Sequence, residues 1–161
     1  PLNIHMSRST GDPEQIAAEF ISNYHKLPER VRDRLVLENE DKGLWTPDRL
    51  FELIHLETGI PITFDNLHHK CNPGLWDTKE AFRVCASTWQ AHNVNPLFHY
   101  SEGGVNDNPR AHVEFATSTP KQFRDQYDSA YTKGLSIDWD VEIKQKDYAI
   151  NHIEEMEMKI K

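Results

Sequence analysis

The chain alternates five times between a short apolar segment and a helical pattern, and each apolar segment closes on a side chain that can bind a metal. These side chains are His5, Glu38, Asp65, His99 and Glu142. Nearly continuous apolar strands separated by helices are typical of a parallel sheet covered on both faces. Because parallel strands deliver their carboxyl ends to one face, we expect these side chains to meet there. The pattern predicts an α/β fold with a multinuclear metal centre.

Helix signals lie between the apolar segments. Helix starts are predicted where a capping side chain precedes a proline or a capping-box residue, at Asp12, Thr46, Asp77 and Thr119. Gly59 and Gly134 are predicted to end the second and fourth helices, because glycine accepts the left-handed conformation common at helix ends. A fifth helix is predicted from about Gln145 onward, and residues 103–109 are predicted to form a turn-rich loop.

The spacing of these units predicts a barrel. Five units in 161 residues give about 32 residues each, and eight such units would need roughly 258, near the ~250 typical of a (β/α)₈ barrel. We therefore interpret residues 1–161 as a single domain that holds strands four to eight of a TIM (β/α)₈ barrel, its C-terminal part. The chain opens inside a strand pattern without an initiator methionine, so we expect the N-terminal half of the barrel to be missing. An open five-stranded α/β sheet is the alternative.

Composition bears on partners and compartment. The formal net charge is −8, which argues against nucleic acid and favours a small-molecule enzyme, unless bound divalent ions or a basic N-terminal half offset it. The mean hydropathy is −0.72, and neither a membrane-spanning run nor a secretory segment is predicted. The two cysteines, Cys71 and Cys85, are too few for a disulfide framework. We expect an intracellular protein of the cytoplasm or nucleus.

The candidate ligands suit divalent cations. Carboxylates bind hard ions, and imidazole binds Zn, Mn or Fe. Two metals about 3.5–4 Å apart can clamp the attacking and leaving oxygens of an in-line phosphoryl displacement. Asp65 and His68 form an Asp-x-x-His pair, and His99 is followed by His112 across the predicted loop. His69 competes with His68 for its place.

Four segments, in this order and spacing, carry a resemblance to a known family. They are Leu27–Asp41, Gly59–His69, Pro96–Glu102 with Arg110–His112, and Asp140–Asp147. The set resembles the UV damage endonucleases, repair enzymes with the barrel of the AP endonuclease IV superfamily. The opening Asn-Ile-His-Met segment, ending at Met6, also resembles the strand that precedes these segments in the family. The likeness runs from end to end.

The resemblance implies a role for each candidate ligand. Glu38 would bridge two metals, and His5 would help to hold one of them. The other ligands would be Asp65, His99 and Glu142 for the neighbouring metal, and His68 and His112 for a third. Asp140 competes with Glu142, since both lie on the same side of the predicted strand. The ions would be divalent, usually manganese, two to three per site, and the catalytic residues would be Glu38, His99 and Glu142.

The resemblance also implies a reaction and a partner. Such enzymes nick double-stranded UV-damaged DNA immediately 5′ to cyclobutane dimers and 6-4 products and leave a 3′-hydroxyl. Tyr100, Ser101 and Arg110 are candidate DNA contacts, because such side chains commonly bind phosphates. Some relatives carry a lysine two residues before the histidine that His99 matches, whereas this chain has Leu97. In the family the first three strands supply a further histidine and the side chains that probe the lesion.

Two other functions fit parts of the same pattern. A sugar isomerase or epimerase of the same barrel class also gathers Glu, Asp and His ligands, and an acidic surface fits it better. It would not require His68 and His112 as a third metal site. The second alternative is an inactive half-barrel that needs its N-terminal half.

Overall fold

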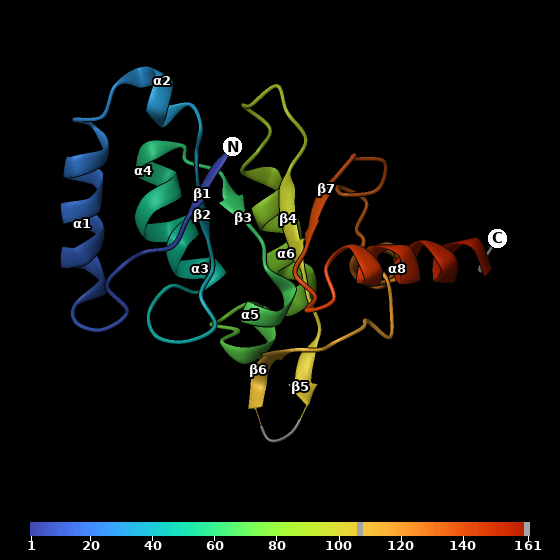
Figure 1. Ribbon diagram of the computed structural model, residues 1–161. Helices are drawn as coiled ribbons and strands as arrows, with labels where there is room; N and C mark the ends of the chain where they lie inside the picture. The colour runs from blue at the N-terminus through green and yellow to red at the C-terminus, as the bar shows by residue number, and fades with distance from the viewer. Residues whose placement is uncertain (106–107, 160–161) are drawn as a thin grey trace.

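The computed structural model describes residues 1–105 and 108–159. Its parallel strands are β1 (Leu2–Ile4), β2 (Leu35–Glu38), β3 (Ile62–Thr63), β4 (Leu97–Tyr100) and β7 (Asp138–Val141), and β5 (Gly103–Val105) pairs antiparallel with β6 (Asn108–His112). The helices are α1 (Pro13–Tyr24), α2 (Glu29–Arg32), α3 (Pro47–Leu50), the π-helical η1 (Phe51–His55), α4 (Leu56–Thr58), α5 (Asn66–Cys71), α6 (Thr78–Ser87), α7 (Pro120–Tyr127) and α8 (Asp147–Lys159). Figure 1 shows the strands through the middle of the molecule, with α1 on one side and α8 on the other.

The parallel strands lie side by side in sequence order. β1, β2 and β3 form one ladder, and β4 pairs with β7. A single parallel bridge between Asp65 and His99 joins the two groups, with His99 N donating to the Phe64 carbonyl at 3.0 Å. The predicted α/β class is confirmed. Over residues 1–105 and 108–159 the strands do not close into a barrel, and β1 and β7 are edge strands.

Aromatic side chains hold the helices against one face of the strands. Phe64, Phe98 and Trp139 lie in or next to β3, β4 and β7, and they pack with Phe82 of α6 and Phe123 of α7 at ring-centroid distances of 5.4 to 6.3 Å. Phe64 and Phe98 are fully buried. Since side chains alternate along a strand, the residue after each aromatic points to the opposite face. The helix-covered core thus fixes the direction of Asp65 and His99.

Helices start at the predicted positions, and side-chain caps form at Asp12, Asp77 and Thr119, whereas Thr46 precedes α3 without a side-chain cap bond. The side chain of Asp12 accepts from the backbone N–H of Glu14 at 3.0 Å, and Asp77 accepts from Glu80 at 2.8 Å. Thr119 and Gln122 form a reciprocal capping box, which satisfies N–H groups that a helix start leaves unpaired.

Helix ends follow the predictions less closely. Gly59 ends the second helix with φ +71° as expected, but α7 stops at Tyr127 rather than near Gly134. After Tyr127 the side chains of Ser129 and Thr132 bond to backbone N–H groups, with Ser129 N donating to Thr132 Oγ1 at 2.8 Å. Such local bonds compete with the helical ladder, so the helix gives way to a turn.

The predicted loop after β4 is in part a hairpin. Residues 103–105 and 108–112 form β5 and β6, while residues 106 and 107 of that prediction lie outside the described residues. A Cβ at Gly103 would come within 2.6 Å of the Pro109 carbonyl and 2.8 Å of Leu67 in α5. The glycine therefore lets the hairpin pack closely on α5, and both lie at the same end of the molecule in Figure 1.

The carboxylate of Glu102 ties the segment before α7 to the end of β4. It accepts hydrogen bonds from the backbone N–H groups of Thr117 at 2.9 Å and Ser118 at 2.8 Å, and from the Tyr100 hydroxyl at 2.8 Å. Burial alone would raise the pKa of the Glu102 carboxyl, but these hydrogen bonds outweigh it and hold the pKa below its usual value.

We expect Glu102→Gln to lower the free energy of unfolding by about 1–3 kcal/mol at pH 7, because bonds to a charged acceptor are lost. The depressed pKa adds stability that is present above the unfolded pKa of about 4.3 and disappears as pH falls through the folded pKa. The difference between wild type and variant should therefore shrink on acidification. Urea unfolding at pH 7 and near pH 3 measures it, with the exposed Glu52→Gln as control. An equal difference at both pH values would contradict this role.

Candidate metal centre

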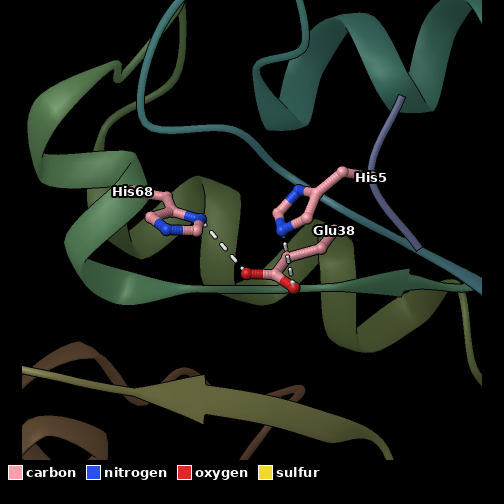
Figure 2. A group of neighbouring side chains, drawn as sticks. All are labelled: His5, Glu38 and His68. Carbon is pink, nitrogen blue, oxygen red and sulfur yellow. Dashed lines mark ion pairs between the residues drawn. The ribbon is translucent and has the colours of Figure 1, made fainter. Parts of the chain in front are cut away.

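Glu38, the last residue of β2, lies at the centre of a group of histidines. Its carboxylate is 3.1 Å from His68 Nδ1 and 3.3 Å from His99 Nδ1 through Oε1, and 3.4 Å from His5 Nε2 through Oε2. Figure 2 shows the carboxylate between the rings of His5 and His68. His5 follows β1, His68 lies in the first turn of α5, and His99 lies in β4. These residues are far apart in sequence, and the parallel sheet brings them together.

The electrostatics of this group favour a charged carboxylate. Glu38 is 2% exposed, and burial raises its pKa, yet the imidazoles of His68 and His99 outweigh burial and hold the pKa well below its usual range. Burial lowers the pKa of the two histidines, but Glu38 raises the pKa of His68 to about 9, and Glu142 with Glu38 raises that of His99 to about 10. A buried negative charge that needs positive partners also suits a divalent cation.

Asp65 follows β3 and is fully buried. Its Oδ1 caps α5 by accepting from the His68 backbone N–H at 2.7 Å, and burial is the main cause that raises its pKa. Its Oδ2 is buried and has no hydrogen-bond partner among the described residues. A buried carboxylate oxygen without a partner is costly unless something binds it.

The side chains form three overlapping groups whose donor atoms lie within 4.8 Å of one another. The groups are His5, Glu38 and His68; Glu38, Asp65 and His99; and His99, Asp140 and Glu142. Carboxylate and imidazole ligands together suit Mn, Fe or Zn. Asp65 and His99 both belong to these groups. Oδ2 of Asp65 is buried 4.0 Å from His68 Nδ1 without a hydrogen bond in the described part of the chain, and Nδ1 of His99 is buried 3.3 Å from the carboxylates of Glu38 and Glu142. The residues present therefore fit divalent ions.

Two asparagines fix the backbone around the group, and the sequence analysis missed both. Asn39, which follows Glu38, donates to the Asp65 carbonyl at 3.1 Å and accepts from the Asp65 N–H at 2.9 Å. Asn66, which follows Asp65, pairs with the backbone of Ser101 in the same way at 2.9 and 2.8 Å. Beyond the strand ends, each asparagine side chain takes the place of a backbone hydrogen-bond partner. The Glu38 segment is thereby bonded to the Asp65 segment, and the Asp65 segment to the residues after His99.

We expect Asn39→Ala to lower the free energy of unfolding by about 2 kcal/mol, because the buried Asp65 N–H loses its partner. Urea unfolding checks this, with Asn23→Ala as the matched control, since the exposed Asn23 side chain accepts from the Lys26 side chain at 3.0 Å and is not part of the ligand segments. Equal stability of the two variants would contradict the proposed clamp.

The structure also places the remaining candidate residues. His112, at the end of β6, lines a cavity of ≈ 470 Å³ together with His5 and His68 but belongs to none of the three groups. His68 rather than His69 reaches Glu38, while the buried His69 packs on Phe64 at 5.4 Å. Asp140 and Glu142 belong to the same group with His99, so both remain candidate ligands.

The three candidate DNA contacts lie in different surroundings. Arg110 lines the same cavity and pairs with Asp41 at 3.1 Å. Tyr100 and Ser101 are each 1% exposed, so neither side chain reaches the surface in this structure. Tyr100 instead bonds to Glu102 and Ser118.

Asn3 is a further residue of the group that the sequence analysis did not select. Its Nδ2 donates to Glu38 Oε2 and lies 3.5 Å from His99 Nε2. The signal was its spacing: Asn3 lies two residues before His5, which directly follows β1, so strand alternation puts the two side chains on the same face. An asparagine in an apolar opening segment is easily taken for a surface residue.

The chain is similar in sequence to known proteins. The family model of the UV-endonuclease UvdE matches residues 1–161. A UV DNA damage endonuclease of Bacillus cereus strain G9842 is 30% identical over 149 residues, covering 92% of this chain and 46% of its own. One of Bacillus anthracis is 32% identical over 114 residues, covering 71% of this chain and 35% of its own.

Similarity extends to a solved structure. The crystal structure of SacUVDE superimposes with a TM-score of 0.75 at 28% identity and covers 96% of this chain and 51% of its own. The chain thus spans about half the length, or less, of the proteins that it matches. By the family model, which covers all of its residues, this chain belongs to the UV-endonuclease UvdE family.

Proposed function

We propose that this chain takes part in DNA repair as an endonuclease that hydrolyses the phosphodiester bond immediately 5′ to UV photoproducts, both cyclobutane dimers and 6-4 products. The observation that carries the proposal is the buried Glu38 carboxylate, which lies within 3.4 Å of nitrogens of three histidines at the strand ends. Matched relatives are named UV DNA damage endonucleases, and a carboxylate shared by several imidazoles is suited to two-metal hydrolysis.

We further propose that the centre holds two to three divalent ions, with manganese as the physiological metal. Glu38 would bridge two ions, and the other ligands would be His5, Asp65, His68, His99, His112 and Glu142. Such ions polarise a phosphoryl oxygen and lower the pKa of bound water. The burial of Glu38 and Asp65, 2% and 0% exposed, would keep water from competing for the same carboxylates.

The protein side chains would have distinct tasks in this reaction. Glu38, His99 and Glu142 would form the catalytic group, with His99 Nδ1 3.3 Å from an oxygen of each carboxylate. Arg110, on the wall of the cavity that His5 and His68 also line, would contact a DNA phosphate. Tyr100 and Ser101 would require a change in side-chain position to do the same, since both are buried.

The shape of the sheet supports a half-barrel. We propose that residues 1–161 are a single domain, the C-terminal part of a TIM (β/α)₈ barrel, in which β1, β2, β3, β4 and β7 are strands four to eight. The edge strands β1 and β7 would pair with an N-terminal half, whose length the relatives suggest, since the chain covers 46% of the Bacillus cereus protein.

We place the enzyme inside the cell. Among the described residues there is no helix with the length and apolar character that a membrane span needs.

Nicking of UV-irradiated duplex DNA with added Mn²⁺ tests the proposed activity. The assay compares the chain alone with a version that carries an N-terminal barrel half, and repeats both with Glu38→Gln. Cleavage 5′ to the lesion that Glu38→Gln removes would support the endonuclease, and cleavage by the longer version alone would support the half-barrel. If neither version cuts while metal still binds, the repair function is wrong and the sugar isomerase becomes the better interpretation.

A further inference from the structure

Asn3 connects two candidate ligands that come from strands not adjacent in the sheet. It lies in β1, and its Nδ2 donates to Oε2 of Glu38 at the end of β2. The same nitrogen is 3.5 Å from Nε2 of His99 in β4, although β3 separates β2 from β4. One side chain therefore contacts both the central carboxylate and the histidine that faces it.

The remaining atom of this amide is poorly satisfied. Asn3 Oδ1 is buried and has no hydrogen-bond partner among the described residues. A buried acceptor without a partner lowers stability, and an apolar residue of similar shape would avoid this cost. The amide is thus better explained by its contacts with Glu38 and His99 than by a contribution to folding.

The two contacts restrict different motions. The Glu38 carboxylate can rotate about its last side-chain torsion, and the donation to Oε2 leaves Oε1 facing His68 and His99, 3.1 and 3.3 Å away. The ring of His99 presents Nδ1 to the carboxylates and Nε2 to Asn3. Nδ2 is a donor, so in this contact Nε2 of a neutral His99 ring is the acceptor and Nδ1 carries the ring proton toward the carboxylates.

We propose that Asn3 is a positioning residue of the metal centre, which sets the orientation of the Glu38 carboxylate and, in the metal-free chain, also contacts the His99 ring. The proposal rests on the proposed metal site and adds a residue that binds no metal itself. Residues with this role typically change metal affinity about 10–100-fold when they are replaced.

The test compares Asn3→Ala with Asn95→Ala in the full chain. Asn95 is a matched control, because its Nδ2 also donates to a carboxylate, Asp138 Oδ1 at 3.1 Å, but at the opposite end of the strands. We expect titration calorimetry to show Mn²⁺ binding about 10–100-fold weaker in Asn3→Ala and unchanged in Asn95→Ala. Asn3→Ser, whose side chain is too short to reach both partners, should show a similar loss and serves if the alanine variant does not fold.

A second readout separates positioning from general destabilisation. Long-range ¹H–¹⁵N spectra of the metal-free chain report the histidine ring nitrogens, and the His99 signals should move in the Asn3 variants but not in Asn95→Ala. Mn²⁺ affinity within twofold of wild type, together with unchanged His99 signals, would overturn the proposal. If the wild-type chain binds no Mn²⁺, the proposed metal site fails by itself, and the ring spectra alone decide the role of Asn3.

Discussion

Glu38→Gln should weaken Mn²⁺ binding by more than about 100-fold, beyond the 10–100-fold typical of residues that only support a metal ligand. The variant keeps the shape of the side chain but removes the charge that faces His5, His68 and His99 at 3.1 to 3.4 Å. Under the proposed function, it also replaces the carboxylate that would bridge two ions with a neutral amide, which offers one oxygen. Titration calorimetry measures the affinity directly.

The control for this variant is Glu19→Gln. Glu19 also forms an ion pair, with Arg8 at 2.7 Å, but its side chain is 52% exposed and lies outside the three ligand groups. Its replacement should leave Mn²⁺ affinity unchanged, because an exposed pair contributes little and binds no metal. If Glu38→Gln bound Mn²⁺ as tightly as Glu19→Gln, Glu38 would not be a ligand.

Phe64→Ala should cause the largest loss of stability, about 3–5 kcal/mol in the free energy of unfolding. The fully buried ring packs against Phe82, Phe98 and Phe123 at centroid distances of 5.9 to 6.3 Å, and its removal leaves a cavity between β3, α6 and α7. Because Phe64 directly precedes Asp65, we also expect weaker Mn²⁺ binding.

Urea unfolding measures the loss, and Phe115→Ala is the matched control. Phe115 is 45% exposed, so the same truncation there removes far less buried apolar area. A loss below about 1 kcal/mol for Phe64→Ala, or one equal to that of the control, would contradict the view that this aromatic core directs the ligand-bearing face.

The strand ends were predictable from sequence because one physical rule governs them. An apolar segment that ends in a carboxylate or imidazole combines a buried strand with a polar terminus, and parallel strands must bring such termini to one face. The approach of His5, His68 and His99 to Glu38 confirms this for residues far apart in the chain. Helix starts such as Asp12 and Thr119 were also predictable, since each capping side chain bonds within three residues of itself and depends only on local sequence.

Features that depend on contacts between neighbouring strands could not be predicted from the sequence. Asn39 and Asn66 are typical turn residues by composition, and their pairing with the next segment is visible only once the strands lie side by side. Likewise, the burial of Tyr100 and Ser101 depends on packing at the end of β4 rather than on residue type. The roles of the candidate ligands themselves stay predictions.

Electron paramagnetic resonance of the chain titrated with Mn²⁺ tests directly whether Glu38 joins two ions, because two ions that share a carboxylate are magnetically coupled. We expect a coupled multi-ion spectrum in the wild-type chain that disappears in Glu38→Gln and persists in Glu19→Gln. A spectrum of isolated ions only, or a coupled spectrum that survives in Glu38→Gln, would contradict a multinuclear centre built on Glu38.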